Sequence, residues 1–183
     1  MLLRRLSCLF AAAFALLSLT ACSGKEGGSE APVTSGFQCD VDVAYRDMQV
    51  KGHLSRPTAG TLLLDVTEPA TLNGMSMEWN GENVTVKLHG LKFDVNPSAI
   101  PQSALGKGIL DALDAAVSLH ENGTVSDEGM TTKGQSVSGE FELLSDPETG
   151  KLLSLSVPSL EMNAVFSNFS FGDETLSLTT TAP

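Results

Sequence analysis

"LNGMSMEWNGENVTVKLHGLKFDV", Leu72 to Val95, decides the fold class, because its large apolar residues fall at every second position within three short runs. The runs are separated by two short segments, Gly81–Asn83 and His89–Gly90. Alternation with period two is typical of a half-buried β-strand, and breaks of this composition favour tight turns. This stretch therefore predicts three antiparallel strands joined as successive hairpins.

The same period continues on both sides of this stretch. Phe37 to Tyr45 alternates strictly, and further strands are expected from Met48 to about Arg56 and over Thr61–Thr67. Later strands are expected around residues 123–126, 133–144, 152–157, 160–171 and 175–180. The apolar parity changes between Phe166 and Phe169, which indicates either a bulge near Ser167–Asn168 or apolar contacts on both faces of that strand.

One segment, Pro101 to about Leu119, follows a helical period instead. Its apolar positions are Leu105, Ile109, Ala112, Leu113, Ala116 and Val117. The carboxylates of Asp111 and Asp114 share the opposite face, which we interpret as a solvated face. The sequence thus predicts a mainly β (α+β) domain: a curved antiparallel sheet or incomplete β-barrel of about 9–11 strands, covered by one central amphipathic helix near 101–119.

The N-terminus has the features of a lipoprotein signal peptide over residues 1–21. Arg4 and Arg5 precede an apolar stretch that is too short for the roughly 20 residues of a membrane-spanning helix. The next residues, Leu19-Thr20-Ala21-Cys22, resemble the bacterial lipobox, which implies acylation of Cys22 and anchoring to a bacterial membrane on its extracytoplasmic side. Residues 22–36 then form an expected flexible tether, and residues 37–183 form the β domain.

The cysteines leave one alternative open. An ordinary signal peptide could be cut nearby, with Cys22 left free or paired with Cys39. With Cys22 acylated, Cys39 remains alone, and its alternation with Phe37 and Val41 predicts a small buried core residue. No disulfide is then expected within the domain.

The charge balance argues against nucleic acid as a partner. Asp and Glu number 22 against 11 Lys and Arg, which gives a formal net charge of −11. Binding to phosphates needs clustered Lys and Arg, and the excess of carboxylates is interpreted as solvated surface charge.

The signal with its lipobox, the polar tether, the stretch Leu72–Val95 ahead of a Leu/Ala-rich helix, and "DPETG" from Asp146 to Gly150 together resemble the LolA-like group of extracytoplasmic proteins. They are also similar to small bacterial lipoproteins that contain such stretches. The resemblance covers roughly Phe37 to Thr180. It implies a curved, incomplete barrel lidded by a helix, with an apolar hollow that holds the acyl chains of lipids or lipoproteins.

Two functions follow as hypotheses. In the first, the domain binds a lipid or another apolar ligand in a cavity beneath the helix. The residues expected to line it are Met48, Met75, Met77, Trp79, Phe93, Leu105, Ile109, Leu113, Phe141, Met162 and Phe166. In the second, these residues fill a packed core, and the domain is a non-catalytic envelope module that binds a protein partner.

An enzymatic function is not expected. The sequence has no His-Glu zinc motif, no Gly-x-Ser-x-Gly elbow, no phosphate-cradling Gly-rich loop and no Cys-x-x-Cys pair. Its three histidines, His53, His89 and His120, are scattered and are interpreted as surface or turn residues. We therefore expect no catalytic residues, no metal site and no cofactor.

Overall fold

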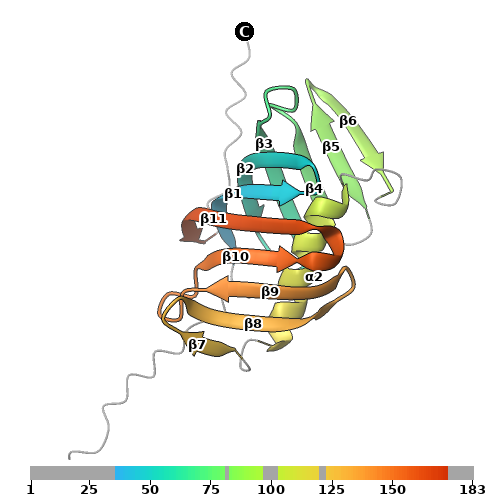
Figure 1. Ribbon diagram of the computed structural model, residues 1–183. Coiled ribbons are helices and arrows are strands. Elements are labelled where there is room, and N and C mark those ends of the chain that lie inside the picture. The colour runs from blue at the N-terminus through green and yellow to red at the C-terminus, as the bar shows by residue number, and fades with distance from the viewer. Residues whose placement is uncertain (1–35, 81–82, 97–102, 120–122, 173–183) are drawn as a thin grey trace, which may run out of the picture.

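The computed structural model describes residues 36–80, 83–96, 103–119 and 123–172. The expected signal peptide, Cys22 with its tether, His120 and the expected strand at 175–180 lie outside these residues. One antiparallel sheet of eleven strands and one long helix make up the described fold (Figure 1). The predicted combination of a mainly antiparallel sheet with a single covering helix is confirmed.

Six strands precede the helix and five follow it. The first six are β1 (Phe37–Tyr45), β2 (Met48–Arg56), β3 (Thr61–Glu68), β4 (Ser76–Asn80), β5 (Val84–Leu88) and β6 (Leu91–Val95). After α2 (Ser103–Leu119) come β7 (Thr124–Ser126), β8 (Gly129–Ser136), β9 (Gly139–Ser145), β10 (Leu152–Val157), a short 3₁₀ turn η3 (Pro158–Leu160) and β11 (Met162–Phe171).

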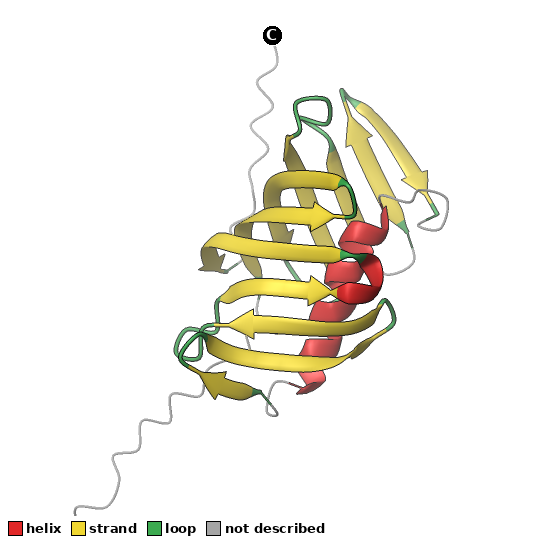
Figure 2. Cartoon of the chain, viewed as in Figure 1, coloured by secondary structure: helices red, strands yellow, loops and turns green. Residues whose placement is uncertain are grey.

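The sheet order is β6-β5-β4-β3-β2-β1-β11-β10-β9-β8-β7. Each half is a meander of neighbouring hairpins, and the two halves meet where β1 pairs with β11. The border strands β6 and β7 do not pair with each other, so the sheet is open. It curves around α2, which crosses its inner face (Figures 1 and 2).

Three boundaries differ by more than one residue from the sequence expectation. The first is the start of β8, which lies at Gly129 and not at Lys133. The segment 133–144 is two strands, because the chain reverses at Val137–Ser138, where Ser136 Oγ donates to the Gly139 carbonyl at 2.9 Å and Gly139 takes a φ of 121°. Residues other than glycine rarely adopt that φ, which explains why a glycine ends the turn. The last strand begins at Met162 and not at Leu160, because Glu161 has a φ of 52° and interrupts the extended backbone.

The parity change in β11 is a β-bulge. Gln38 of β1 faces Ser170, whereas Asp40 faces Ser167, so Asn168 and Phe169 together oppose one residue of β1. Asn168 has a φ of 51°, a value that asparagine tolerates better than most residues. The bulge turns Phe169 toward Phe37, and their rings stack with centroids 4.8 Å apart.

Candidate functional site

Ten of the eleven residues predicted to line an apolar cavity lie in or against one hydrophobic core. Eight are buried: Met77, Trp79, Leu105, Ile109, Leu113, Phe141, Met162 and Phe166. Met48 and Met75 are partly buried against them. Phe93 does not join this core, because it lies on the border strand β6 and is 50% exposed.

The helix lies directly on side chains of the sheet and of the turn η3. A Cβ atom added to Gly106 would fall 2.2 Å from the indole ring of Trp79, and one added to Gly108 would fall 2.5 Å from Leu160 Cδ1. Only hydrogen atoms fit between the helix backbone and these side chains. At both crossings, therefore, the space beneath the helix is filled, as in the packed-core hypothesis.

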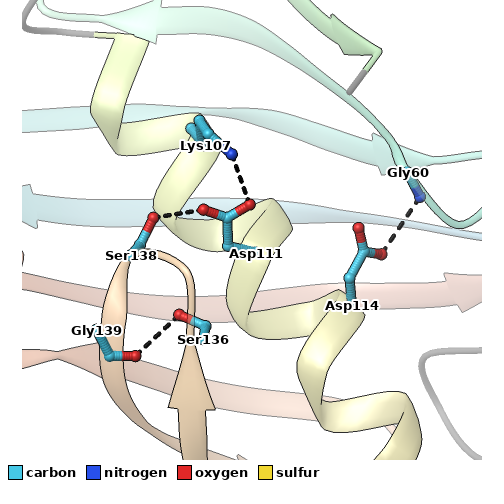
Figure 3. A network of polar contacts seen from close by, with 7 residues as sticks. All are labelled: Gly60, Lys107, Asp111, Asp114, Ser136, Ser138 and Gly139. Carbon is cyan, nitrogen blue, oxygen red and sulfur yellow. Dashed lines mark hydrogen bonds and ion pairs between the residues drawn. The ribbon is translucent and has the colours of Figure 1, made fainter. Parts of the chain in front are cut away.

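Polar contacts fix the helix to both halves of the sheet (Figure 3). Asp111 accepts hydrogen bonds from Lys107 Nζ at 2.7 Å and from Ser138 Oγ at 2.6 Å. Asp114 binds the guanidinium of Arg56 and accepts from the Gly60 N–H at 3.3 Å. The interpretation as a solvated face is wrong for Asp111, whose side chain is only 11% exposed, whereas the Asp114 side chain is 39% exposed. Both carboxylates join α2 to the sheet, Asp111 at the β8–β9 turn and Asp114 at β2.

Arg56 is the largest charged group in the interior. The residue is 0% exposed and lies at the end of β2. Burial lowers the pKa of the Arg56 guanidinium, and the charge of Asp114 opposes that shift. The alternation of β2 places Arg56 on the inner face, but sequence reasoning had no signal that its partner lies 58 positions away on the helix.

A polar cluster lies on the outer face of the sheet. His53 Nδ1 donates to one oxygen of Asp40, and Asn168 Nδ2 donates to the other at 2.6 Å. These side chains border a hollow of about 290 Å³, with Asp65 on the adjacent strand. The two hydrogen bonds lower the pKa of Asp40 from its ordinary value of 3.8.

The pH dependence of stability should report on Asp40. A lowered carboxyl pKa stabilises the folded state above pH 3.8, and that contribution is lost as the pH falls through the folded-state pKa. The advantage of the wild type over Asp40→Asn in urea unfolding is thus expected to be larger at pH 6 than at pH 3. Asn168→Gly is the matched control, since glycine keeps the bulge conformation but removes one hydrogen bond. An equal advantage at both pH values would contradict this role.

Cys39 is buried, as expected, in the inner face of β1. Burial, with a smaller effect of the Asp40 charge, raises the pKa of its thiol to about 12. At pH 8 only about one thiol in ten thousand is then ionised, and the thiolate is the reactive form. We expect iodoacetamide to leave Cys39 unmodified in the folded protein and to alkylate it in guanidinium chloride, as measured by peptide mass mapping. Rapid alkylation of the folded protein would contradict this expectation.

The remaining predicted features bear less on function. His89 lies in the β5–β6 turn with a φ of 49°. No group of three or more His, Cys, Asp or Glu residues within the described ranges has an arrangement that could hold a metal ion. Among the helices that the structure describes, none is long and apolar enough to cross a membrane.

The β5–β6 hairpin continues the apolar inner face of the sheet, and this face becomes exposed along the border strand β6. The face consists of Val84, Val86, Leu88, Leu91, Phe93 and Val95, which pair across the two strands. Val84 is fully buried beside the core, whereas Leu91 is 61% exposed. We call Leu88, Leu91 and Phe93 the hairpin patch. Figure 1 shows this hairpin leaning away from the rest of the sheet.

The alternation in the sequence indicates an apolar face on this hairpin, but of the three patch residues only Phe93 was predicted to line the cavity. Leu91 and Phe93 continue the alternation of the strands before them, so they must lie on the inner face. They also belong to the last strand of the first meander, and the last strand of a meander can lie at the border of the sheet. Which strands the helix covers is decided by its crossing direction, and the alternation carries no information on that direction.

No protein-family model matches the sequence, and a search of curated proteins finds no match. Solved structures do show similarity. A conserved protein from Thermus thermophilus is 14% identical, with a TM-score of 0.49, covering 85% of this chain and 90% of its own. A LolA superfamily protein from Nitrosomonas europaea is 11% identical, with a TM-score of 0.42, covering 78% and 88%.

A third similar structure is that of the CwlD amidase from Clostridioides difficile in complex with the GerS lipoprotein. The matching chain is 14% identical, with a TM-score of 0.40, covering 76% of this chain and 83% of its own. Similarity at this level is a likeness of fold alone.

Proposed function

We propose that this chain is a membrane-tethered, extracytoplasmic lipoprotein whose β domain binds another protein, without catalysis, through the hairpin patch. One observation carries the proposal: the apolar inner face of the sheet is packed beneath α2 but continues uncovered onto β6, where Leu91 and Phe93 are exposed. Contiguous exposed apolar surface of this kind is typical of an interaction site.

The filled contact beneath the helix supports protein binding over ligand storage. Trp79 is 1% exposed, and its indole occupies the space against Gly106. A ligand between α2 and the sheet would have to displace this ring. A partner at the hairpin patch, in contrast, requires no change in the packed core.

The polar clusters also support a non-catalytic role. Asp111 and Asp114 are engaged in holding the helix, and Asp40 accepts hydrogen bonds from His53 and Asn168 on the outer face. Each of these carboxylates thus has a structural role that explains it without chemistry.

Site-specific photocrosslinking in the native envelope tests the proposal. A photoreactive phenylalanine analogue at Leu91 is expected to give a discrete adduct with a different protein, which the same analogue at Val137 does not give. Val137 is the matched control, because it is 89% exposed and apolar but lies on the distant β8–β9 turn. Equal adducts at both positions, or none at Leu91, would overturn the assignment of the hairpin patch as a protein-binding surface.

The tether is tested separately. Cys22→Ala is expected to release the chain from the membrane fraction and to remove the diacylglyceryl mass from the intact protein. If the wild type lacks that mass and fractionates like the variant, the anchor is absent.

A second candidate function is reversible lipid binding, which the continuity of the hairpin patch with the core face favours. In this case the exposed residues would be the open end of an apolar groove. The photocrosslinking experiment separates the two candidates, because a lipid carrier would give a lipid adduct at Leu91. Lipid mass spectrometry of the purified chain provides the second measurement.

A further inference from the structure

In the described part of the chain, the outer edge of β6 is regular and is paired with no other strand. Within the described residues β6 pairs only with β5, in five successive cross-strand pairs without a bulge. Backbone N–H and C=O groups alternate in direction along a strand, so every second residue of β6 directs them away from β5. An edge of this kind is a template for another strand.

The two borders of the sheet differ in this respect. β7, at the opposite border, is only three residues long, and short edge strands are one way in which proteins prevent edge pairing. β6 has five residues, contains no proline, and is exposed along Leu91 to Asp94. Among the described strands, one border of the sheet is therefore short, whereas the other offers a longer edge strand.

The direction of the free backbone groups follows from the hairpin register. Leu88 pairs with Leu91 across the two-residue turn His89–Gly90, and both turn residues have positive φ values. In such a turn the flanking residues are joined by backbone hydrogen bonds, so Leu91 directs its groups toward β5. The groups of Lys92 and Asp94 then point to the open edge.

The sequence of β6 is complementary to itself in one antiparallel register. Centred on Phe93, the pairing sets Lys92 opposite Asp94 of a second copy, twice by symmetry, and Leu91 opposite Val95. Lys92 and Asp94, whose backbone groups point to the open edge, then lie opposite each other, so their N–H and C=O groups can form hydrogen bonds between the two strands. Opposite charges directly across a ladder are stabilising, and paired aromatic residues add to them.

Charges select this register over its neighbours. In a register centred on Lys92, the two Lys92 side chains would lie opposite each other. In a register centred on Asp94, the two Asp94 carboxylates would lie opposite each other. Like charges in directly opposed positions are destabilising. Within the described residues Lys92 forms no ion pair, whereas Lys87 on β5 already contacts Glu78 at 3.8 Å. Thr85 Oγ1, on the neighbouring strand β5, donates a hydrogen bond of 2.6 Å to the Asp94 carboxylate and so fixes its position.

We infer that two copies of this chain pair through their β6 edges, in the antiparallel register centred on Phe93, to form one continuous sheet. The two-fold axis then lies at the Phe93 pair, and both hairpin patches lie on the same side of the joined sheet. This inference rests on the proposed function of the patch and extends it, since the dimer presents one binding surface twice as wide.

Disulfide trapping in the full-length, membrane-bound chain tests the register. Phe93→Cys is expected to form a disulfide-linked dimer under mild oxidation, because residues directly opposite at a non-hydrogen-bonded pair have Cα atoms about 4.5 Å apart. Leu91→Cys is the matched control: it has the same face and a similar exposure, but its counterpart in the second copy lies several residues away. Equal dimer yields from both variants would show random collision and overturn the inference.

Charge exchange tests the pairing. In the Phe93→Cys background, Lys92→Asp and Asp94→Lys are each expected to lower the dimer yield at least about tenfold, because each creates two like-charge pairs. The double exchange Lys92→Asp with Asp94→Lys should restore it, as should mixing the two single variants, whose charges are complementary. Failure of both rescues would overturn the inference.

The outcomes separate this inference from the proposed function. A monomeric Phe93→Cys chain that still gives a foreign protein adduct at Leu91 would overturn the dimer alone. A trapped dimer that gives no foreign adduct would leave the dimer standing and overturn the patch as a site for another protein.

Discussion

A Gly106→Ala variant is expected to unfold with a free energy about 2 kcal/mol lower than that of the wild type, although alanine favours helices by up to about 1 kcal/mol over glycine. The added Cβ would lie 2.2, 2.3 and 2.4 Å from three atoms of the Trp79 indole, far inside contact distance. The indole is a rigid ring buried in the core, so α2 or the whole ring must shift.

Gly108→Ala is the control for this prediction. Its Cβ would meet the ends of flexible side chains, Leu160 Cδ1 at 2.5 Å and Met162 Cε at 3.3 Å, which can move at lower cost. Both variants gain the same helix propensity, so the difference between them in urea unfolding isolates the Trp79 contact. If both variants unfold at the same urea concentration as the wild type, α2 does not lie on the indole ring.

An Asp114→Asn variant is expected to lose about 3 kcal/mol of stability, because it leaves the guanidinium of Arg56 charged in the interior without its carboxylate. Removing one partner of a buried ion pair costs about 3–5 kcal/mol. The lower end of this range applies to the pair of Arg56 and Asp114, because the Asp114 side chain is 39% exposed to solvent. Equilibrium unfolding in urea measures the loss.

Replacing both partners separates the charge from the packing. In Arg56→Met with Asp114→Asn, no charge is left in the interior, and asparagine can still accept from the Gly60 N–H. Its stability is expected to return to within about 1 kcal/mol of the wild type, because an apolar side chain of similar length can replace a buried ion pair without loss. A double variant as unstable as Asp114→Asn would show that packing, and not the loss of the ion pair between Arg56 and Asp114, causes the decrease in stability.

Local patterns were enough to predict most of the sheet. The alternation in Leu72–Val95 corresponds to β4, β5 and β6, and the predicted turn at His89–Gly90 joins β5 to β6. The parity change in the last strand predicted a bulge at Asn168 as one of two possibilities. The division at Val137 was missed, because serine, valine and glycine occur in strands as well as in turns and the alternation continues through them.

The site could be predicted less well, because its features depend on where α2 crosses the sheet. Burial of Trp79 follows from the alternation, but whether the space beside it is empty depends on Gly106, 27 positions later in the chain. The same apolar pattern describes a cavity wall and a packed core. Met77 and Phe93 both lie opposite Val86, on the two strands that neighbour β5, yet Met77 is 6% exposed and Phe93 is 50% exposed.

The pairing of β1 with β11 has a consequence for the order of folding. These are the first and last described strands, and they meet along their length, from Phe37 opposite Phe171 to Tyr45 opposite Met162. The hairpins within each half are local, but this central seam needs residues more than a hundred positions apart. Contacts of such separation form late and slowly. A growing chain can therefore build two partial sheets, but it becomes one cooperative domain only after β11 has been synthesised and has paired with β1.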